Sequence, residues 1–239
     1  MKSAQGIFYG IGVGPGDPEL LTVKAINAIK NSNFIIAPKT EKKSDSLALT
    51  IAAPYLRADV QIVYQTFPMV KNFEESPELF EGNVTEILKY LRDGQNVGFL
   101  TLGDPLFFST YIYIFKLLKK SGVQIETVAG VPAFLAIAAK IGYPLACGND
   151  ILSIIPATAD TEKISAALKN SDAAVLMKVY KNFGEVTEIL NAENLSENAV
   201  LVSRCGLEGE KISDDINSLK NEKLNYLSTI LTSKSKVKS

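Results

Sequence analysis

The chain has 239 residues, 46% of them hydrophobic, which is enough to bury a sizeable core in one large α/β domain or two compact ones. Its 25 Lys and Arg residues nearly balance 26 Asp and Glu residues, so the net charge of -1 gives no overall attraction to nucleic acid or to an anionic membrane. The composition therefore predicts a folded, soluble enzyme or binding protein.

Histidine is absent, which removes the usual general base, the usual metal ligand and every Ser-His or Cys-His nucleophile pair. Cys147 and Cys205 are too few for a disulfide framework and lack the Cys-x-x-Cys spacing of a zinc site, so reduced thiols in a cytoplasmic protein are expected. No export signal or membrane span is expected, because the apolar stretch 131–147 is broken by Lys140 and Pro144. Hydrolytic and zinc-dependent functions become poor hypotheses.

In the first half of the chain, short apolar runs alternate with segments of helical periodicity, which is typical of parallel strands joined by crossover helices. Asp17 is expected to cap the first helix, with Pro18 at its first position. The helix face is expected to carry apolar residues at i, i+3 and i+4 spacing. Strands are expected at 6–13, 34–37, 60–64 and 97–102, and helices at 20–30 and 84–92.

The second half repeats this alternation and predicts a second α/β domain. We place the boundary near Ser121 and Gly122, giving domains of residues 1–120 and 121–239, although a Lys-Lys-Ser-Gly sequence equally fits a helix end and a tight turn. Strands are expected at 123–128, 152–155, 173–178, 199–203 and 226–232, and helices at 133–141, 161–168 and 183–190.

The segment Tyr9-Gly-Ile-Gly-Val-Gly-Pro-Gly-Asp-Pro18 predicts a strand that runs into a glycine-rich turn and then a helix. Such a turn lets a ligand approach the backbone and the free amides at the helix start. Its glycine spacing imitates a dinucleotide-binding loop, so a nicotinamide-dependent oxidoreductase is an alternative function. Against that alternative, Pro15 removes an amide donor, and the next strand ends in Ala37-Pro38-Lys39 where a ribose-binding acid is needed. A tight turn without any ligand is the plainest interpretation of this motif alone.

A second Gly-Asp-Pro sequence occurs in Phe99-Leu-Thr-Leu-Gly-Asp-Pro-Leu-Phe-Phe-Ser-Thr110, at the expected carboxyl end of a strand. Ligands of open parallel sheets bind at that edge. The Asp104 carboxylate suits a cationic ligand, such as an ammonium or a sulfonium, better than a diphosphate, which makes Asp104 the leading candidate for a cofactor contact. The alternative is a helix N-cap followed by Pro105.

Three further segments each end a predicted strand. Val128-Ala-Gly-Val-Pro-Ala-Phe134 is another strand-to-helix turn, whereas Leu176-Met-Lys178 and Val202-Ser-Arg-Cys-Gly-Leu-Glu-Gly209 each place one basic residue there. Lys39, Lys42 and Lys43 form a basic loop after the second strand. For each of these, the alternative to a binding role is an architectural turn, a core methionine or a solvated charge.

In this order, the motifs resemble the tetrapyrrole methylase family of class III S-adenosylmethionine-dependent methyltransferases, over nearly the whole chain. The Leu-Met-Lys and Arg-Cys-Gly blocks and the final Tyr226-Leu-Ser-Thr-Ile230 are similar to the subgroup that methylates C-20 of precorrin-2 or cobalt-precorrin-2 in cobalamin biosynthesis. The resemblance implies two α/β domains with a cleft between them, a cytoplasmic homodimer, a tetrapyrrole substrate, and S-adenosylmethionine as the cofactor that becomes S-adenosylhomocysteine.

The resemblance also implies site residues, one set for each ligand. At the third turn the chain departs from relatives that carry Ser-Ser or Thr-Ala, because its Pro-Ala pair offers neither a hydroxyl nor, at the proline, an amide. The implied cofactor contacts are Ile11, Gly103, Asp104, Phe107, Pro132, Ala133, Met177, Ser203 and Thr229. The implied substrate contacts are Gly14, Pro15, Lys39, Lys178 and Arg204, with Lys42 as a further candidate anchor for substrate carboxylates.

Methyl transfer from a sulfonium to an electron-rich carbon is an in-line displacement governed by orientation and electrostatics, so an enzyme without histidine can perform it. The proton that leaves the methylated carbon has three candidate acceptors, Asp104, Asp17 and solvent. Methylation at another ring position, methylation of a protein side chain as in the diphthine synthases, and ligand binding without catalysis are the remaining alternatives.

Overall fold

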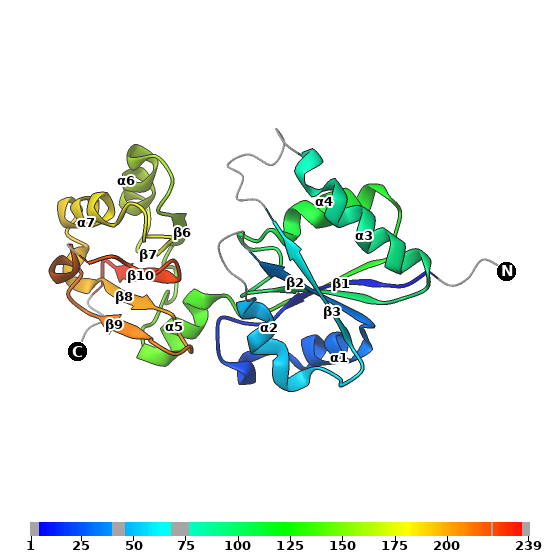
Figure 1. Cartoon of the computed structure of the whole chain (residues 1–239). Helices are drawn as coiled ribbons and strands as arrows, with labels where there is room; N and C mark the ends of the chain where they lie inside the picture. The colour runs from blue at the N-terminus through cyan, green and yellow to red at the C-terminus, as the bar shows by residue number, and fades with distance from the viewer. Residues whose placement is uncertain (1–4, 40–45, 68–76, 221, 236–239) are drawn as a thin grey trace. The chain divides into compact units, whose positions relative to one another are not determined.

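The computed structural model describes residues 5–39, 46–67, 77–220 and 222–235. The chain divides into two compact units, Met1–Pro132 and Ala133–Ser239 (Figure 1). This division lies later in the chain than the boundary expected near Ser121. The reason is that strand β5 (Ile125–Val128) pairs with β1 (Phe8–Gly12) and so belongs to the first sheet.

The first unit is a five-stranded sheet of order β3-β2-β4-β1-β5 whose described strands all pair in parallel, as predicted. Helices α3 and α4 cover one face, and α1 and α2 cover the other (Figure 1). Its other strands are β2 (Phe34–Lys39), β3 (Gln61–Thr66) and β4 (Val97–Thr101), and its helices are α1 (Val23–Asn31), α2 (Leu47–Ala52), α3 (Glu81–Arg92) and α4 (Tyr111–Lys120).

The start of α1 corrects one expectation. The Asp17 carboxylate accepts a hydrogen bond from the Glu19 amide at 2.9 Å and so caps a short 3-10 turn, Pro18–Leu20, instead of the helix. The N-cap of α1 is Thr22, whose hydroxyl accepts from the Ala25 amide at 3.0 Å. Thr22 therefore has the role that was expected of Asp17, since its hydroxyl satisfies a free amide in the first turn of the helix.

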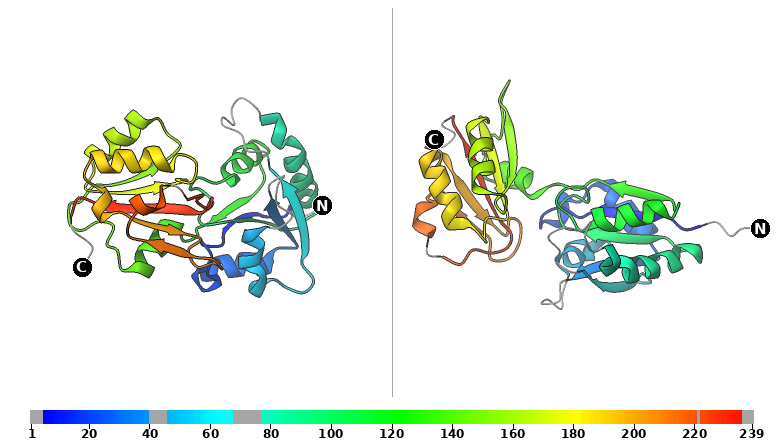
Figure 2. Two further views of the ribbon diagram at one scale, coloured as in Figure 1. Left: turned by 60° about the vertical axis from the view of Figure 1, so that its left-hand side comes forward. Right: turned by 90° about the horizontal axis from the view of Figure 1, so that it is seen from above.

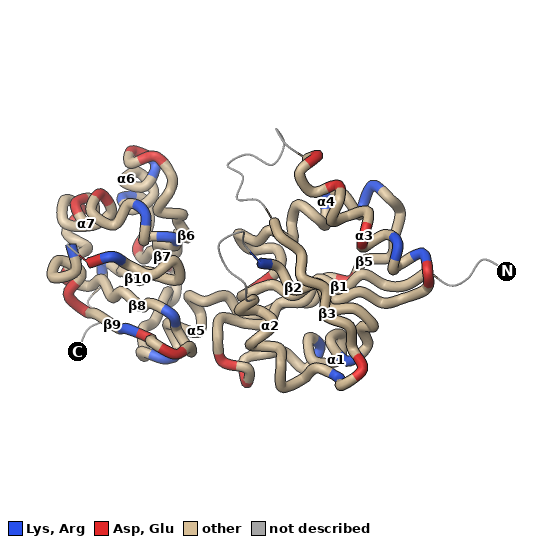
Figure 3. The backbone as a smooth tube through the Cα atoms, viewed as in Figure 1, with Lys and Arg blue, Asp and Glu red and all other residues tan. Residues whose placement is uncertain are grey.

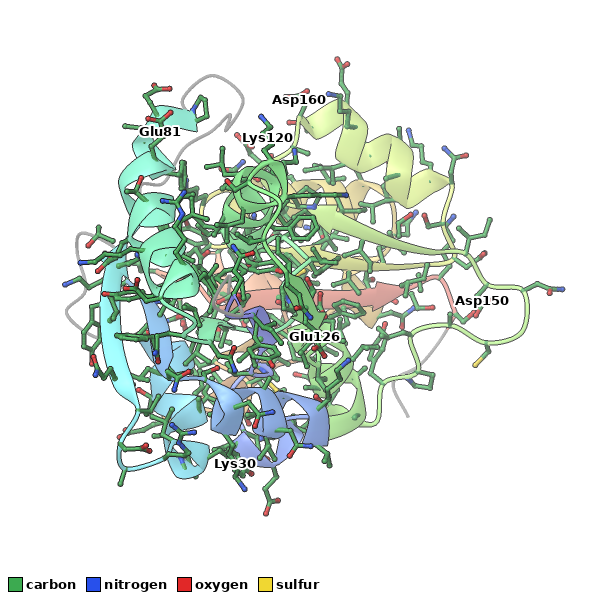
Figure 4. The ribbon with its side chains drawn as sticks, turned by 90° about the vertical axis from the view of Figure 1, so that its right-hand side faces the viewer. Lys30, Glu81, Lys120, Glu126, Asp150 and Asp160 are labelled. Atoms are coloured by element: carbon green, nitrogen blue, oxygen red, sulfur yellow. The ribbon has the colours of Figure 1, made fainter. Side chains whose placement is uncertain are left out.

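The central strands β1 and β4 are buried on both faces, because helices cover the sheet on either side. Side chains alternate between the faces, so Phe99 packs under α3 and α4 while Leu100 packs with Ile11 against α1 and α2. At the edge of the sheet, Glu126 of β5 forms an ion pair with Lys24 of α1 at 2.8 Å (Glu126 is labelled in Figure 4). The strand ends are thereby held on a rigid, two-sided core.

The second unit has a mixed sheet of order β6-β7-β10-β8-β9. Only β6 and β7 pair in parallel; β10 runs antiparallel to both β7 and β8, and β9 antiparallel to β8, so the expectation of parallel strands throughout the second half is wrong. Helices α6 and α7 pack on one face, and β10 lies between β7 and β8 (Figure 2). The strands are β6 (Leu152–Pro156), β7 (Ala173–Met177), β8 (Val200–Ser203), β9 (Lys211–Ser213) and β10 (Ser228–Ser233), and the helices are α5 (Ala133–Ile141), α6 (Thr161–Lys169) and α7 (Phe183–Ala192).

Basic and acidic side chains are interspersed along both units, consistent with the near-zero net charge (Figure 3). Within the described residues, no helix combines the length and the apolar character that crossing a membrane requires.

Candidate functional site

Three loops of the first unit meet at the carboxyl edge of its sheet, where parallel strands all end. The loop after β1 and the loop after β4 pair through their backbones: the Gly103 amide donates to the Gly14 carbonyl at 2.8 Å, and the Gly14 amide donates to the Gly103 carbonyl at 3.3 Å. Both glycines have a positive φ, 75° at Gly14 and 72° at Gly103, a conformation that side chains other than glycine rarely adopt. The two glycine-rich motifs of the sequence are therefore hydrogen-bonded to each other in the structure.

The third loop, after β5, approaches the other two so closely that only glycine fits. A Cβ atom on Gly12 would lie 2.6 Å from the Gly130 Cα atom and 2.7 Å from the Gly103 carbonyl oxygen. A Cβ atom on Gly130 would overlap that same carbonyl oxygen. Gly12, Gly103 and Gly130 thus lie where the backbones of the three loops pack directly against one another, and we call this group the glycine cradle.

Asp104 ties the glycine cradle together. Its Oδ1 accepts from the Leu106 amide at 2.8 Å, and its Oδ2 accepts from the Gly130 amide at 3.0 Å. The first bond shapes the Gly-Asp-Pro turn, and the second joins the loop after β4 to the loop after β5. Each carboxylate oxygen has a second lone pair, so the group can also interact with a ligand. The helix N-cap interpretation is wrong, because residues 105–108 form a turn and α4 begins only at Tyr111, after its N-cap Thr110.

The remaining predicted residues of the first unit lie around the cradle in different environments. Pro15 is buried beside Gly14, and Phe107 and Pro132 lie in the loops after β4 and β5, partly exposed. The Ile11 side chain is fully buried among the apolar residues packed under α1 and α2, so it supports the cradle from below. Lys39 ends β2 with its Nζ atom 5.8 Å from the centre of the Tyr64 ring, a cation–π contact. Lys42 and Lys43 lie outside the described residues.

In the second unit, the predicted residues gather at one edge of the mixed sheet. Met177 ends β7 and Ser203 ends β8, while antiparallel β10 begins beside them, pairing Thr229 with Met177 and Ser228 with Ser203. Ala133 is the first residue of α5, where the chain passes from the first unit to the second. The sequence could not predict that Thr229 begins rather than ends its strand at this edge, since that requires the strand direction.

The residues that follow the strand ends carry backbone strain. Of the four described non-glycine residues with positive φ, Phe108 (49°), Lys178 (62°) and Arg204 (54°) lie in the loops that follow β4, β7 and β8. Such conformations are unfavourable for residues with side chains and concentrate at binding and catalytic sites, where surrounding structure enforces them. Lys178 and Arg204 were both predicted site residues, and this geometry marks them again, independently of charge.

The loop after β8 is held by a network of charged groups. The Arg204 Nε atom donates to the Glu208 carbonyl at 2.6 Å, and the Gly206 amide donates to the Glu210 carboxylate, which pairs with Lys140 at 2.7 Å. Burial alone would raise the pKa of the Glu210 carboxyl, but the Lys140 ammonium and the Gly206 amide hold that pKa below its ordinary value. Part of the Arg204 guanidinium is therefore structural.

Sequence reasoning missed the structural roles of Gly130 and Glu210 and did not single out Thr101. Gly130 lies in a motif that was interpreted as an architectural turn. Glu210 forms an ion pair with Lys140, which is distant from it in the sequence. Thr101 is the last residue of an otherwise apolar strand, and this isolated hydroxyl before Gly-Asp-Pro was the available signal.

The comparison with known proteins decides the family. The family model described as tetrapyrrole (corrin/porphyrin) methylases matches residues 8–218. The chain belongs to the tetrapyrrole methylases. It is 35% identical to the cobalt-precorrin-2 C(20)-methyltransferase of Salmonella typhimurium, over 96% of this chain and 97% of that protein. It is 36% identical to the probable cobalt-precorrin-2 C(20)-methyltransferase of Methanocaldococcus jannaschii, over 87% of this chain and 89% of that protein.

Solved structures of other tetrapyrrole methylases share the fold. A cobalt precorrin-4 methyltransferase matches with a TM-score of 0.74 and 23% identity, over 95% of this chain and 94% of that one. A uroporphyrin-III C-methyltransferase from Thermus thermophilus, solved in complex with S-adenosylhomocysteine, matches with a TM-score of 0.68 and 21% identity, over 96% of this chain and 98% of that one. The two-unit α/β architecture of this methylase is therefore that of its family.

Proposed function

We propose that this tetrapyrrole methylase transfers a methyl group from S-adenosylmethionine to C-20 of precorrin-2 or of its cobalt complex during cobalamin biosynthesis. The observation that carries the proposal is the near full-length similarity, at 35% identity, to a protein named for methylation at C-20 of cobalt-precorrin-2. The cytoplasmic location and the homodimer that the resemblance implies are part of the same proposal.

The first unit offers a surface that fits such a cofactor. The glycine cradle holds three loops together at the carboxyl edge of the sheet, and Asp104 adds a negative charge suited to a cationic group. When bound, S-adenosylmethionine supplies an electrophilic methyl group. The residues that the family resemblance implies as its contacts are Gly103, Asp104, Phe107, Pro132, Ala133, Met177, Ser203 and Thr229.

The work of the protein is then to bind and orient. Lys39, Lys178 and Arg204 are proposed to hold substrate carboxylates through charge-assisted hydrogen bonds, and Gly14 and Pro15 are proposed as further substrate contacts. Fixed loops at the strand ends favour catalysis, because correct orientation of the reacting atoms accounts for much of the rate of a displacement reaction. The strained backbones at Lys178 and Arg204 point to fixed side-chain directions at this edge.

Incubation with S-adenosylmethionine labelled in the methyl group tests the proposal, with precorrin-2 offered with and without cobalt. We expect a labelled macrocycle whose NMR spectrum places the new methyl at C-20. A label at another ring carbon would reassign the position, and no label in either macrocycle would overturn the proposal. Calorimetry with S-adenosylhomocysteine and with NAD separates the oxidoreductase alternative, for which only NAD would bind.

The pH dependence of substrate binding tests Lys178. Burial, and secondly the Lys181 charge, lower the pKa of the Lys178 ammonium below that of an ordinary lysine. As pH rises, Lys178 therefore loses its charge before exposed lysines do, and we expect the KM for the carboxylate-rich substrate to rise in that range. Lys178→Arg, which stays charged, should remove the rise.

The pH dependence of stability distinguishes weaker substrate binding from unfolding. Because the folded chain releases the Lys178 proton more readily than the unfolded chain, Lys178 contributes increasing stability as pH rises through the interval between its lowered and ordinary pKa. Weakening of substrate binding there, with no loss of folded protein by circular dichroism, supports the role. An identical pH profile for Lys178→Arg would exclude it.

A further inference from the structure

Thr101, the last residue of β4, carries a buried hydroxyl that the described structure does not use. The residue is only 7% exposed, and its Oγ1 atom has no hydrogen-bond partner among the residues that the structure describes. A buried hydroxyl without a partner destabilises the folded chain, since it has given up its bonds to water. At the edge of a parallel sheet where ligands bind, a hydrogen bond to a ligand would remove this cost.

The neighbours of Thr101 explain why its hydroxyl is unpaired. Gly12 lies level with it on β1 and has no side chain. On the other side, β2 pairs Ile36 with Phe99, and continuing that register by two residues places Pro38 level with Thr101. Neither neighbouring side chain has a hydrogen-bonding atom. By contrast, the hydroxyls of Tyr111 and Thr127, on the same side of the sheet, bond to each other at 2.6 Å.

The surroundings of Thr101 suit a flat methyl acceptor. By alternation it shares a face with Phe99, under α3 and α4, and with Gly12, which lies level with it on β1. The loop that leads from β4 to α4 exposes two apolar side chains, Leu106 at 55% and Phe108 at 44%. Exposed apolar side chains in the loop that follows a buried hydroxyl suit a macrocycle with an apolar face and polar atoms at its rim and centre.

We propose that the Thr101 hydroxyl binds the methyl acceptor by hydrogen-bonding to a polar atom of the tetrapyrrole. Because the hydroxyl has no partner among the described residues, turning it toward the ligand breaks no described hydrogen bond. This inference rests on the proposed function and assigns one further binding residue to it.

The test compares three variants of the full-length chain. Thr101→Val keeps the shape and removes the hydroxyl, whereas Thr101→Ser keeps the hydroxyl. Thr232→Val is the matched control, because Thr232 is also buried, at 1% exposed, but its hydroxyl donates to the Leu195 carbonyl at 2.8 Å. The measurements are the KM for precorrin-2, its Kd from absorbance titration without methyl donor, the Kd of S-adenosylhomocysteine from calorimetry, and the Tm.

Thr101→Val is expected to raise the KM and Kd for precorrin-2 about tenfold, the usual effect of one lost hydrogen bond. Its Kd for S-adenosylhomocysteine should stay at the wild-type value, and its Tm should equal or exceed the wild-type Tm. Thr101→Ser should bind precorrin-2 nearly as well as the wild type. Thr232→Val should lower the Tm and leave both ligands' affinities unchanged.

Three results would overturn the inference. Unchanged precorrin-2 affinity in Thr101→Val would exclude a contact, and weaker binding of S-adenosylhomocysteine would give the hydroxyl to the methyl donor. A Tm drop as large as that of Thr232→Val would make it structural. A wild-type chain that neither binds nor methylates precorrin-2 would instead refute the proposed function, and this inference with it.

Discussion

Replacing Gly130 with alanine is expected to destabilise the chain by about 3 kcal/mol and to abolish measurable binding of S-adenosylhomocysteine. The new Cβ atom would overlap the Gly103 carbonyl oxygen and press on the Gly12 backbone, and neither group can move without distorting a paired loop. Chemical denaturation measures the stability and calorimetry measures the binding. The effect is large because the obstacle is backbone on every side.

Gly82→Ala provides the control for the loss of glycine itself. Gly82 lies in α3 with open space where a Cβ would go, so this variant should be more stable than the wild type by about 0.4–1 kcal/mol and should bind normally. If Gly130→Ala behaved like Gly82→Ala, the close approach of the three loops would not matter for the site.

Asp104→Ala is expected to weaken S-adenosylhomocysteine binding about 100-fold and to lower the stability by about 1–3 kcal/mol, since it leaves the Leu106 and Gly130 amides without their acceptor. The stability and the affinity of Asp104→Asn should lie between those of the wild type and those of Asp104→Ala. The asparagine amide oxygen can accept one of these bonds, while its NH₂ group faces the other donor. The expected loss of affinity has two causes: the negative charge is removed, and the bond that joins the loops after β4 and β5 is lost.

Asp215→Ala separates the two contributions. The Asp215 carboxylate likewise accepts bonds from nearby backbone amides, those of Asn217 and Ser218, but it lies away from the strand ends that carry the candidate site. Its replacement should reduce stability without changing affinity. Normal cofactor binding by Asp104→Ala would show that Asp104 has a structural role only.

Most elements could be predicted from the sequence, because hydrophobic periodicity is a local property. The helix at 84–92 corresponds to α3, and the strands of the first sheet lie where expected and run in parallel. Strand direction in the second sheet could not be predicted, since the pattern of β10 is the same whichever way the strand runs. Short β9, with only three residues, and α2 lack the length that makes periodicity visible.

The site was predicted as a set of strand ends, and the structure gathers those ends at one edge of each sheet. That Gly103 and Asp104 connect to Gly130 depends on β5 lying beside β1, a contact between distant parts of the chain. The unpaired state of the Thr101 hydroxyl depends on two neighbouring strands at once. Local sequence identifies the residue types, whereas their partners follow only from topology.

The position of β10 has a consequence for how the chain folds during synthesis. The first unit consists of one continuous stretch, so all of its strands have emerged before the second unit is begun. In the second unit, β7 and β8 are joined only through β10, the last strand. Until residues 228–233 arrive, the growing chain therefore carries two separate pairs of strands with open inner edges, β6 with β7 and β8 with β9. Such edges can pair with other chains, so we expect the risk of aggregation to be highest before residues 228–233 are added.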